Sequence, residues 1–145
     1  MRRHTFLAAL LASALLGLGT PARAADEGLV VVANAPLRGL DAEALKRIYT
    51  GRMIELDGQA LRPVNLAPGQ AARKRFLAAV LQQEEDDYLA YWTVRRYVGK
   101  GAPPRELATP AEVAAHVRAT PGAIGYLDAA DLKPGLVVVL RVPAR

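Results

Sequence analysis

The stretch TPAEVAAHVRATPGAIGYL, at residues 109–127, predicts a helix that leads directly into a buried strand. Thr109-Pro110-Ala111-Glu112 is a capping box with proline at the first helical position. Apolar side chains then recur at helical spacing until Pro121-Gly122 ends the helix. Residues 123–127 follow as an apolar run of strand length. A helix that returns into a strand is typical of a layered α/β fold.

The same alternation of helix and strand continues in both directions from this stretch. Predicted strands cover 29–33, 61–66, 123–127 and 136–142, and predicted helices lie at 41–51, 68–82, 85–97 and 110–119. Asp41 suits the N-cap of the first helix, and Pro68 suits the first position of the second. Because the two element types alternate throughout, we expect an α/β fold, a three-layer sandwich.

The predicted helix at 85–97 begins with acids and ends with bases. Residues 84–87 are all acidic, whereas Arg95, Arg96 and Lys100 lie toward the end. Both groups complement the helix dipole, which favours this interpretation over a cation site. Leu89, Trp92 and Tyr97 are the predicted core residues of this helix.

Residues 1–24 have the three parts of a signal peptide. Arg2 and Arg3 precede an apolar run at 6–18, and Ala22-Arg23-Ala24 offers a cleavage site. The apolar run is shorter than the roughly 20 residues that cross a bilayer. We therefore expect a periplasmic protein of a bacterial envelope, cleaved after Ala24, whose residues 25–145 form one domain.

Charge and composition exclude several classes of protein. The net charge of +5 falls by three when the arginines of the predicted signal peptide are removed, and no basic stripe with interleaved aromatics remains, so we predict no nucleic-acid partner. The absence of cysteine excludes disulfides, thiolate metal sites and thiol nucleophiles. His116 is the only histidine after residue 24 and has no partner at a catalytic spacing. We predict no catalytic residue, no metal site and no cofactor.

Several segments, in order, carry a resemblance to a known family. They are LKRIYTGR at 45–52, RF at 75–76, YW at 91–92, GKGAPP at 99–104 and VRATPGAIGY at 117–126. Over about residues 28–127 the chain resembles the phosphate-binding proteins of bacterial ABC importers, and especially their short stand-alone relatives. The resemblance implies a type II periplasmic-binding-protein fold, and the short chain implies one of its two lobes. It also implies a periplasmic solute-binding protein for phosphate or a similar oxyanion, with an ABC permease or another envelope protein as partner.

The family grips its anion with a Ser-Gly-Thr turn at a helix start, and this chain lacks both hydroxyls there. The turn falls on Gln70-Ala71-Ala72. What remains is the set of free N–H groups at the helix start, which suits an anion. The predicted ligand-binding residues are Asn34, Gly69, Gln70, Ala71 and Arg73, with Lys74 as further nearby charge. The alternative is a solvated helix start, with Asn34 in an ordinary turn.

A second functional hypothesis stays open at this point. The chain could be a non-catalytic interaction module that retains the fold, has lost phosphate binding, and docks onto another envelope component or onto itself as a homodimer. A single lobe leaves an apolar face where its partner lobe packs, and such faces mark interfaces. Anion-dependent stabilisation favours the first hypothesis, and concentration-dependent association favours the second.

Overall fold

The computed structural model describes residues 28–144, so the predicted signal peptide at 1–24 lies outside the described residues. Within this range no helix has the length and apolar character needed to cross a membrane. The strands are β1 Leu29–Ala33, β2 Glu55–Leu56, β3 Gln59–Ala60, β4 Arg62–Leu66, β5 Arg105–Leu107, β6 Ala123–Asp128 and β7 Val137–Val142. The helical segments are α1 Ala42–Tyr49, α2 Ala71–Phe76, the π-helical η1 Leu77–Leu81, α3 Glu85–Tyr97, α4 Pro110–Ala119 and the short 3₁₀ turn η2 Ala129–Asp131.

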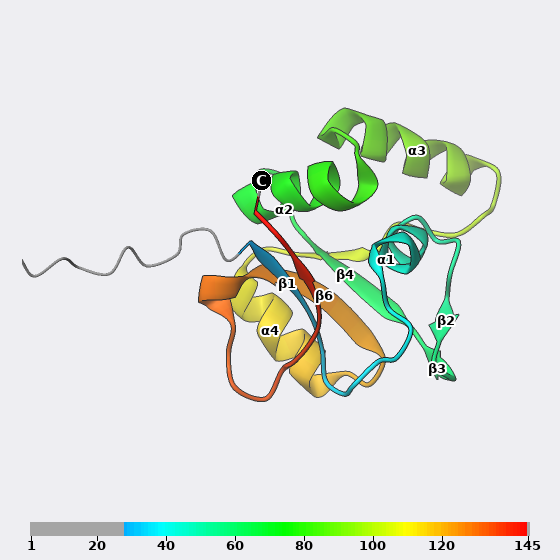
Figure 1. The fold of residues 1–145 in the computed structure, drawn as a ribbon. Coiled ribbons are helices and arrows are strands. Elements are labelled where there is room, and N and C mark those ends of the chain that lie inside the picture. The colour runs from blue at the N-terminus through cyan, green and yellow to red at the C-terminus, as the bar shows by residue number, and fades with distance from the viewer. Residues whose placement is uncertain (1–27, 145) are drawn as a thin grey trace, which may run out of the picture.

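Five strands form one mixed sheet in the order β5-β4-β6-β1-β7 (Figure 1). β4 runs parallel to β5 and to β6, whereas β1 runs antiparallel to β6 and to β7. The remaining two strands, β2 and β3, form a separate hairpin. All five residues of β1 are buried, as expected for a valine-rich strand with neighbours on both sides.

Helices cover both faces of this sheet, which confirms the predicted α/β sandwich. Gly125 of β6 faces α4 so closely that a Cβ there would lie 2.9 Å from Val113 Cγ1. The next residue, Tyr126, points to the opposite face and stacks on Phe76 of α2 with ring centroids 3.9 Å apart. Because successive side chains of a strand point to opposite faces, β6 forms the middle layer between α4 and α2.

The sequence predicted that the second helix begins at Pro68, but in the structure it begins at Ala71. Gly69 adopts φ +93°, which is outside the helical region, and Gln70 is the N-cap with an extended backbone. Pro68 and Gly69 therefore form a turn before the helix. After Phe76 the helix widens into η1, and Gln82 ends it in a left-handed conformation with φ +56°.

Two of the three predicted core residues of α3, Leu89 and Tyr97, are exposed in the structure. Trp92 is buried as expected, but the second buried residue of α3 is Tyr88. Leu89 is 45% exposed and Tyr97 is 92% exposed. Tyr88 and Trp92 are four residues apart and share one helix face, so Tyr97 lies on the other side.

Candidate functional site

The predicted helix start borders a pocket of about 500 Å³ between the beginning of α2 and the beginning of α3. Its lining residues are Gly69, Gln70, Ala71, Arg73, Lys74, Gln83, Glu84 and Glu85. Four of the five predicted ligand-binding residues therefore meet at one place. This place follows the carboxyl end of β4, the end of a parallel strand at which open α/β sheets bind ligands.

The backbone at the start of α2 offers donors to this pocket. No side chain caps the helix, because the N-cap residue Gln70 directs its Nε2 to the carbonyl oxygen of Ala108 at 2.9 Å. The N–H groups of a first helical turn have no partner within the helix. The donors at Ala71 and Ala72 are therefore not satisfied by a capping side chain.

Arg73 lies at the back of the pocket, where its donors are already engaged. Its side chain is 1% exposed and forms a bidentate pair with Glu85, at 2.8 Å from Nε to Oε2 and 2.6 Å from Nη2 to Oε1. Nη1 donates to the carbonyl oxygen of Leu66 at 2.9 Å and contacts Glu106 at 3.3 Å. The guanidinium therefore connects α2 to β4, α3 and β5, and most of its donors point away from a solute.

The charge balance around Arg73 favours its ionised form. Burial alone lowers the pKa of Arg73, but the hydrogen bond and charge of Glu85 and the charge of Glu106 raise it above the ordinary value. Two carboxylates thus offset one guanidinium. Of the lysine and arginine side chains that line the pocket, only Lys74 is exposed.

Asn34, the fifth predicted residue, lies at the other end of the sheet. It follows Ala33, which pairs with Ile124 near the start of β6, and Ile124 in turn pairs with Pro63 near the start of β4. The start of α2 follows the opposite end of β4, a strand of five residues that is about 16 Å long. Asn34 therefore does not form a second wall of the pocket, and in Figure 1 the segment after β1 lies far from α2.

A buried hydrogen-bonded cluster of three tyrosines and Asn65, which no sequence pattern predicted, lies beneath the pocket. Tyr49 Oη donates to the carbonyl oxygen of Val64 at 2.8 Å. Tyr126 Oη accepts from the N–H of Leu66 at 3.2 Å and donates to Asn65 Oδ1. The register pairs β4 with β6 only at residues 62–63 and 123–124, and these phenols satisfy β4 backbone groups beyond that point.

The same cluster continues toward α3. Asn65 Nδ2 donates to Tyr88 Oη at 3.3 Å, and Tyr88 Oη donates to the carbonyl oxygen of Tyr49 at 3.2 Å. Burial raises the pKa of Tyr88 to about 12, and it also raises the pKa of Tyr49 and of Tyr126. The phenols are therefore neutral donors that hold the strand end below the pocket. Tyr49 and Tyr126 lie in the IYTGR and PGAIGY segments, which is the sequence signal that was available, whereas Tyr88 lies in neither segment.

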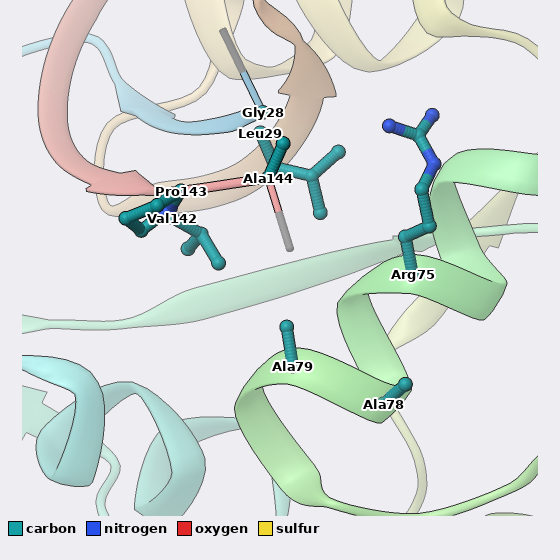
Figure 2. A pocket seen from close by; sticks show the side chains of 8 residues that line it. All are labelled: Gly28, Leu29, Arg75, Ala78, Ala79, Val142, Pro143 and Ala144. Carbon is teal, nitrogen blue, oxygen red and sulfur yellow. The ribbon is translucent and has the colours of Figure 1, made fainter. Parts of the chain in front are cut away.

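A second, largely apolar pocket of about 230 Å³ lies between the strand pair β1–β7 and the helical segments α2 and η1. Figure 2 shows Arg75, Ala78 and Ala79 on the helical side, with Leu29 and Val142 on the strand side. Arg75 forms an ion pair with Asp128, so the one cation that lines this pocket is already balanced. The arrangement offers apolar contacts and no free charge.

The described residues hold no group of three or more His, Asp or Glu side chains able to bind a metal ion. His116 is partly buried on α4, next to the core residue Val117, and no hydrogen bond to its ring occurs within residues 28–144. The groups that the pocket at the start of α2 offers to a ligand are backbone donors, the amides of Gln70 and Gln83, and the ammonium group of Lys74.

Comparisons with known proteins identify the fold. No family model matches the chain, and no curated protein matches it. Among solved structures, an ABC-type phosphate transport receptor from Vibrio cholerae matches with a TM-score of 0.61 and 18% identity. A putative phosphate ABC transporter substrate-binding protein with bound phosphate, from Clostridium perfringens, matches with a TM-score of 0.62 and 18% identity. Each match covers 79% of this chain but only 45% and 44% of the respective receptor, so the chain has the fold of a single lobe.

Proposed function

We propose that this chain, which has the fold of one lobe of the phosphate receptors, is a periplasmic solute-binding protein that takes phosphate or a similar oxyanion at the start of α2. The observation that carries the proposal is the pocket of about 500 Å³ at the uncapped start of that helix, at the carboxyl end of β4. Backbone N–H groups at a helix start, together with the positive end of the dipole, favour an anion. We propose an ABC permease or another envelope protein as the partner.

The ligand contacts in this proposal come from the backbone N–H groups of Gly69 and Ala71, the second N–H of the Gln70 amide, and the ammonium group of Lys74. The backbone N–H of Gln70 already donates to the carbonyl oxygen of Ala67 at 3.3 Å. Arg73 serves the proposal indirectly, because its pair with Glu85 neutralises one of the two carboxylates that line the pocket. Glu84 forms no ion pair within residues 28–144 and leaves a negative charge at the rim. We therefore expect modest affinity, limited by repulsion between Glu84 and the anion.

The test is a titration of the protein with phosphate, sulfate and chloride at matched ionic strength, read as thermal stability and as binding heat. A ligand that binds only the folded state adds about 2.7 kcal/mol of stability at a hundredfold excess over Kd. We expect a phosphate-selective or sulfate-selective gain. Glu84→Gln should strengthen it by removing the repulsion, and Lys74→Gln should weaken it.

Lys133→Gln is the matched control, because it removes one exposed lysine that does not line the pocket. If every salt stabilises the protein equally, or if Lys74→Gln and Lys133→Gln have the same effect, the anion site is refuted.

The interaction module remains the second candidate, and one observation favours it. Large apolar side chains are exposed on α3 and at its C-cap, among them Val94 at 63%, Tyr97 at 92% and the C-cap residue Val98 at 55%. A surface helix normally directs its apolar residues toward the core.

A further inference from the structure

A third pocket, of about 250 Å³, lies between the segment that follows α1 and the segment that leads into β5. In Figure 1, α1, the hairpin β2–β3 and the loop that follows α3 lie on the same side of the molecule. The lining is mostly apolar and includes Met53, Ile54, Trp92 and Pro103. Ile54 is 76% exposed, so the apolar surface continues from the pocket to the outside. No lining residue is shared with the pocket at the start of α2.

Three arginines from three different segments border this pocket. Arg105 lines the pocket, and Arg52 directly follows the lining residue Gly51. Arg95 reaches the same place from α3, because its Nη2 donates to the carbonyl oxygen of Gly51 at 3.4 Å. Arg52 and Arg95 also lie against the ring of Tyr91, with their Cζ atoms 5.9 and 5.5 Å from its centroid. The rim of the apolar pocket is therefore positively charged.

These cations lack the carboxylates that balance other arginines of the chain. Arg73 and Arg75 both form ion pairs with acids. None of the ion pairs within residues 28–144 involves Arg52, Arg95 or Arg105. The Nε atom of Arg95 is shielded from solvent and has no hydrogen-bond partner in that range. An incompletely paired guanidinium is costly to shield, and a carboxylate bound at its terminal nitrogens would offset part of that cost.

We infer that this pocket, with its arginine rim, binds an acidic segment of a partner protein in which an apolar side chain is flanked by carboxylates. The apolar lining suits the side chain, and guanidinium groups pair with carboxylates in a planar, bidentate geometry. An inorganic anion leaves the apolar lining unused, and an aliphatic acid with one carboxylate balances one arginine of three. Glu55, which follows the lining residue Ile54, likewise offsets only one of them.

Trp92 reports directly on the occupation of this pocket. It is the only tryptophan of the chain, it lines the pocket, and the Cζ atom of Arg95 lies 5.7 Å from its ring. A ligand that enters the pocket or displaces the guanidinium therefore changes the surroundings of the indole. Tryptophan emission is thus specific for this site, without a label.

The probe is a five-residue peptide in which a leucine is flanked on each side by two glutamates. Titration of the protein at low ionic strength should give a saturable change in tryptophan emission, and added salt should weaken the binding. One control peptide carries glutamines in place of the glutamates, and another carries glycine in place of the leucine. Each should bind at least about fivefold more weakly, because each lacks one of the two complementary features.

Variants of the rim arginines test the site from the side of the protein. Arg52 and Arg105 are exposed, so Arg52→Gln and Arg105→Gln should retain the fold, which circular dichroism checks. Each should raise the Kd of the acidic peptide by about two- to fivefold, as expected for a pair near the surface. Arg118→Gln is the matched control, because it removes an exposed arginine of α4 that does not line the pocket, and it should leave the Kd unchanged.

Several outcomes would overturn the inference. These are no saturable change in emission, equal binding of either control peptide, and equal losses for Arg105→Gln and Arg118→Gln. Binding to anionic lipid vesicles that requires Arg105, without binding of the acidic peptide, would also overturn it and indicate a membrane surface instead. Phosphate is absent from all these measurements, so their outcome is independent of the proposed anion site.

Discussion

The pair between Arg73 and Glu85 leads to an unusual expectation about stability, which is that removing the acid costs more than removing the base. Arg73 is 1% exposed, whereas the carboxylates of Glu85 and Glu106 are 34% and 41% exposed. A buried charge that loses its partner cannot be hydrated, but a carboxylate near the surface can. The two halves of the pair are therefore not equivalent.

For Glu85→Ala, two charge-assisted hydrogen bonds at 2.8 and 2.6 Å are lost and the guanidinium stays buried. Breaking a buried pair in this way costs about 3–5 kcal/mol. Glu106 still contacts the guanidinium at 3.3 Å, so we expect a loss at the low end, about 3 kcal/mol. For Arg73→Met, the carboxylates become hydrated and the new side chain fills much of the space. The main loss is then the bond to the Leu66 carbonyl, and we expect about 1–2 kcal/mol.

The assay is urea-induced unfolding of both variants, of the double variant and of Asp86→Ala, at neutral pH. Asp86 is an exposed acid in the same helical turn, so Asp86→Ala reports the dipole contribution alone, about 0.3–1 kcal/mol. The double variant should resemble Arg73→Met, because no buried charge remains in it. If Glu85→Ala costs no more than Asp86→Ala, or if Arg73→Met costs more than Glu85→Ala, the argument from unequal burial is wrong.

Two further predictions concern the backbone and pH. Gly122 has φ +80°, and a Cβ there would lie 2.3 Å from the Ala60 carbonyl oxygen, so Gly122→Ala should lower the free energy of unfolding in urea by more than about 2 kcal/mol. Gly99 has φ +75° with open space around it, so Gly99→Ala should lower the free energy of unfolding by about 1 kcal/mol. Equal losses for the two variants would contradict the steric argument. Because burial raises the pKa of Tyr88 to about 12, and the unfolded chain ionises near 10, the free energy of unfolding should fall as pH rises above about 10. Tyr88→Phe should reduce this dependence, and a flat profile up to about pH 11 would refute the raised pKa.

The caps of α1 and α4 and the buried strand β1 were predictable from the sequence because they depend on near neighbours, whereas the short strands β2, β3 and β5 were not among the predicted strands. Asp41 accepts a hydrogen bond from the N–H of Ala44 at 2.7 Å, and Thr109 accepts one from the N–H of Glu112 at 3.2 Å, as the capping patterns indicated. The valine-rich run at 29–33 is the fully buried strand β1. In each case the deciding atoms lie within a few residues of one another.

The start of α2 was partly predictable. The sequence directed attention to Gly69, Gln70 and Ala71, and these residues do line one pocket. The sequence did not indicate that Gly69 lies outside the helix, because Pro68 is equally compatible with a first helical turn and with a turn before it. The conformation of Gly69 decides between the two.

The contacts of Arg73 and the position of Asn34 relative to the pocket were decided by tertiary structure alone. Arg73 contacts Glu85 and Glu106, which are 12 and 33 residues away, so no local pattern contains the pair that occupies its donors. Asn34 lies far from the pocket because β1 runs antiparallel to β6 while β4 runs parallel to it. Spacing along the chain carries no information about the direction in which two distant strands pair.

The sequence by itself thus determined the four main helices, four of the five strands of the main sheet, the α/β class and the region of the helix start at which a solute is proposed to bind. The tertiary structure decided which charges remain free there, which tyrosines hold the strand end beneath it, and which face of α3 is exposed. The physical reason is that capping and periodicity act between residues close in the chain, whereas burial and ion pairing act between residues that only the folded sheet brings together.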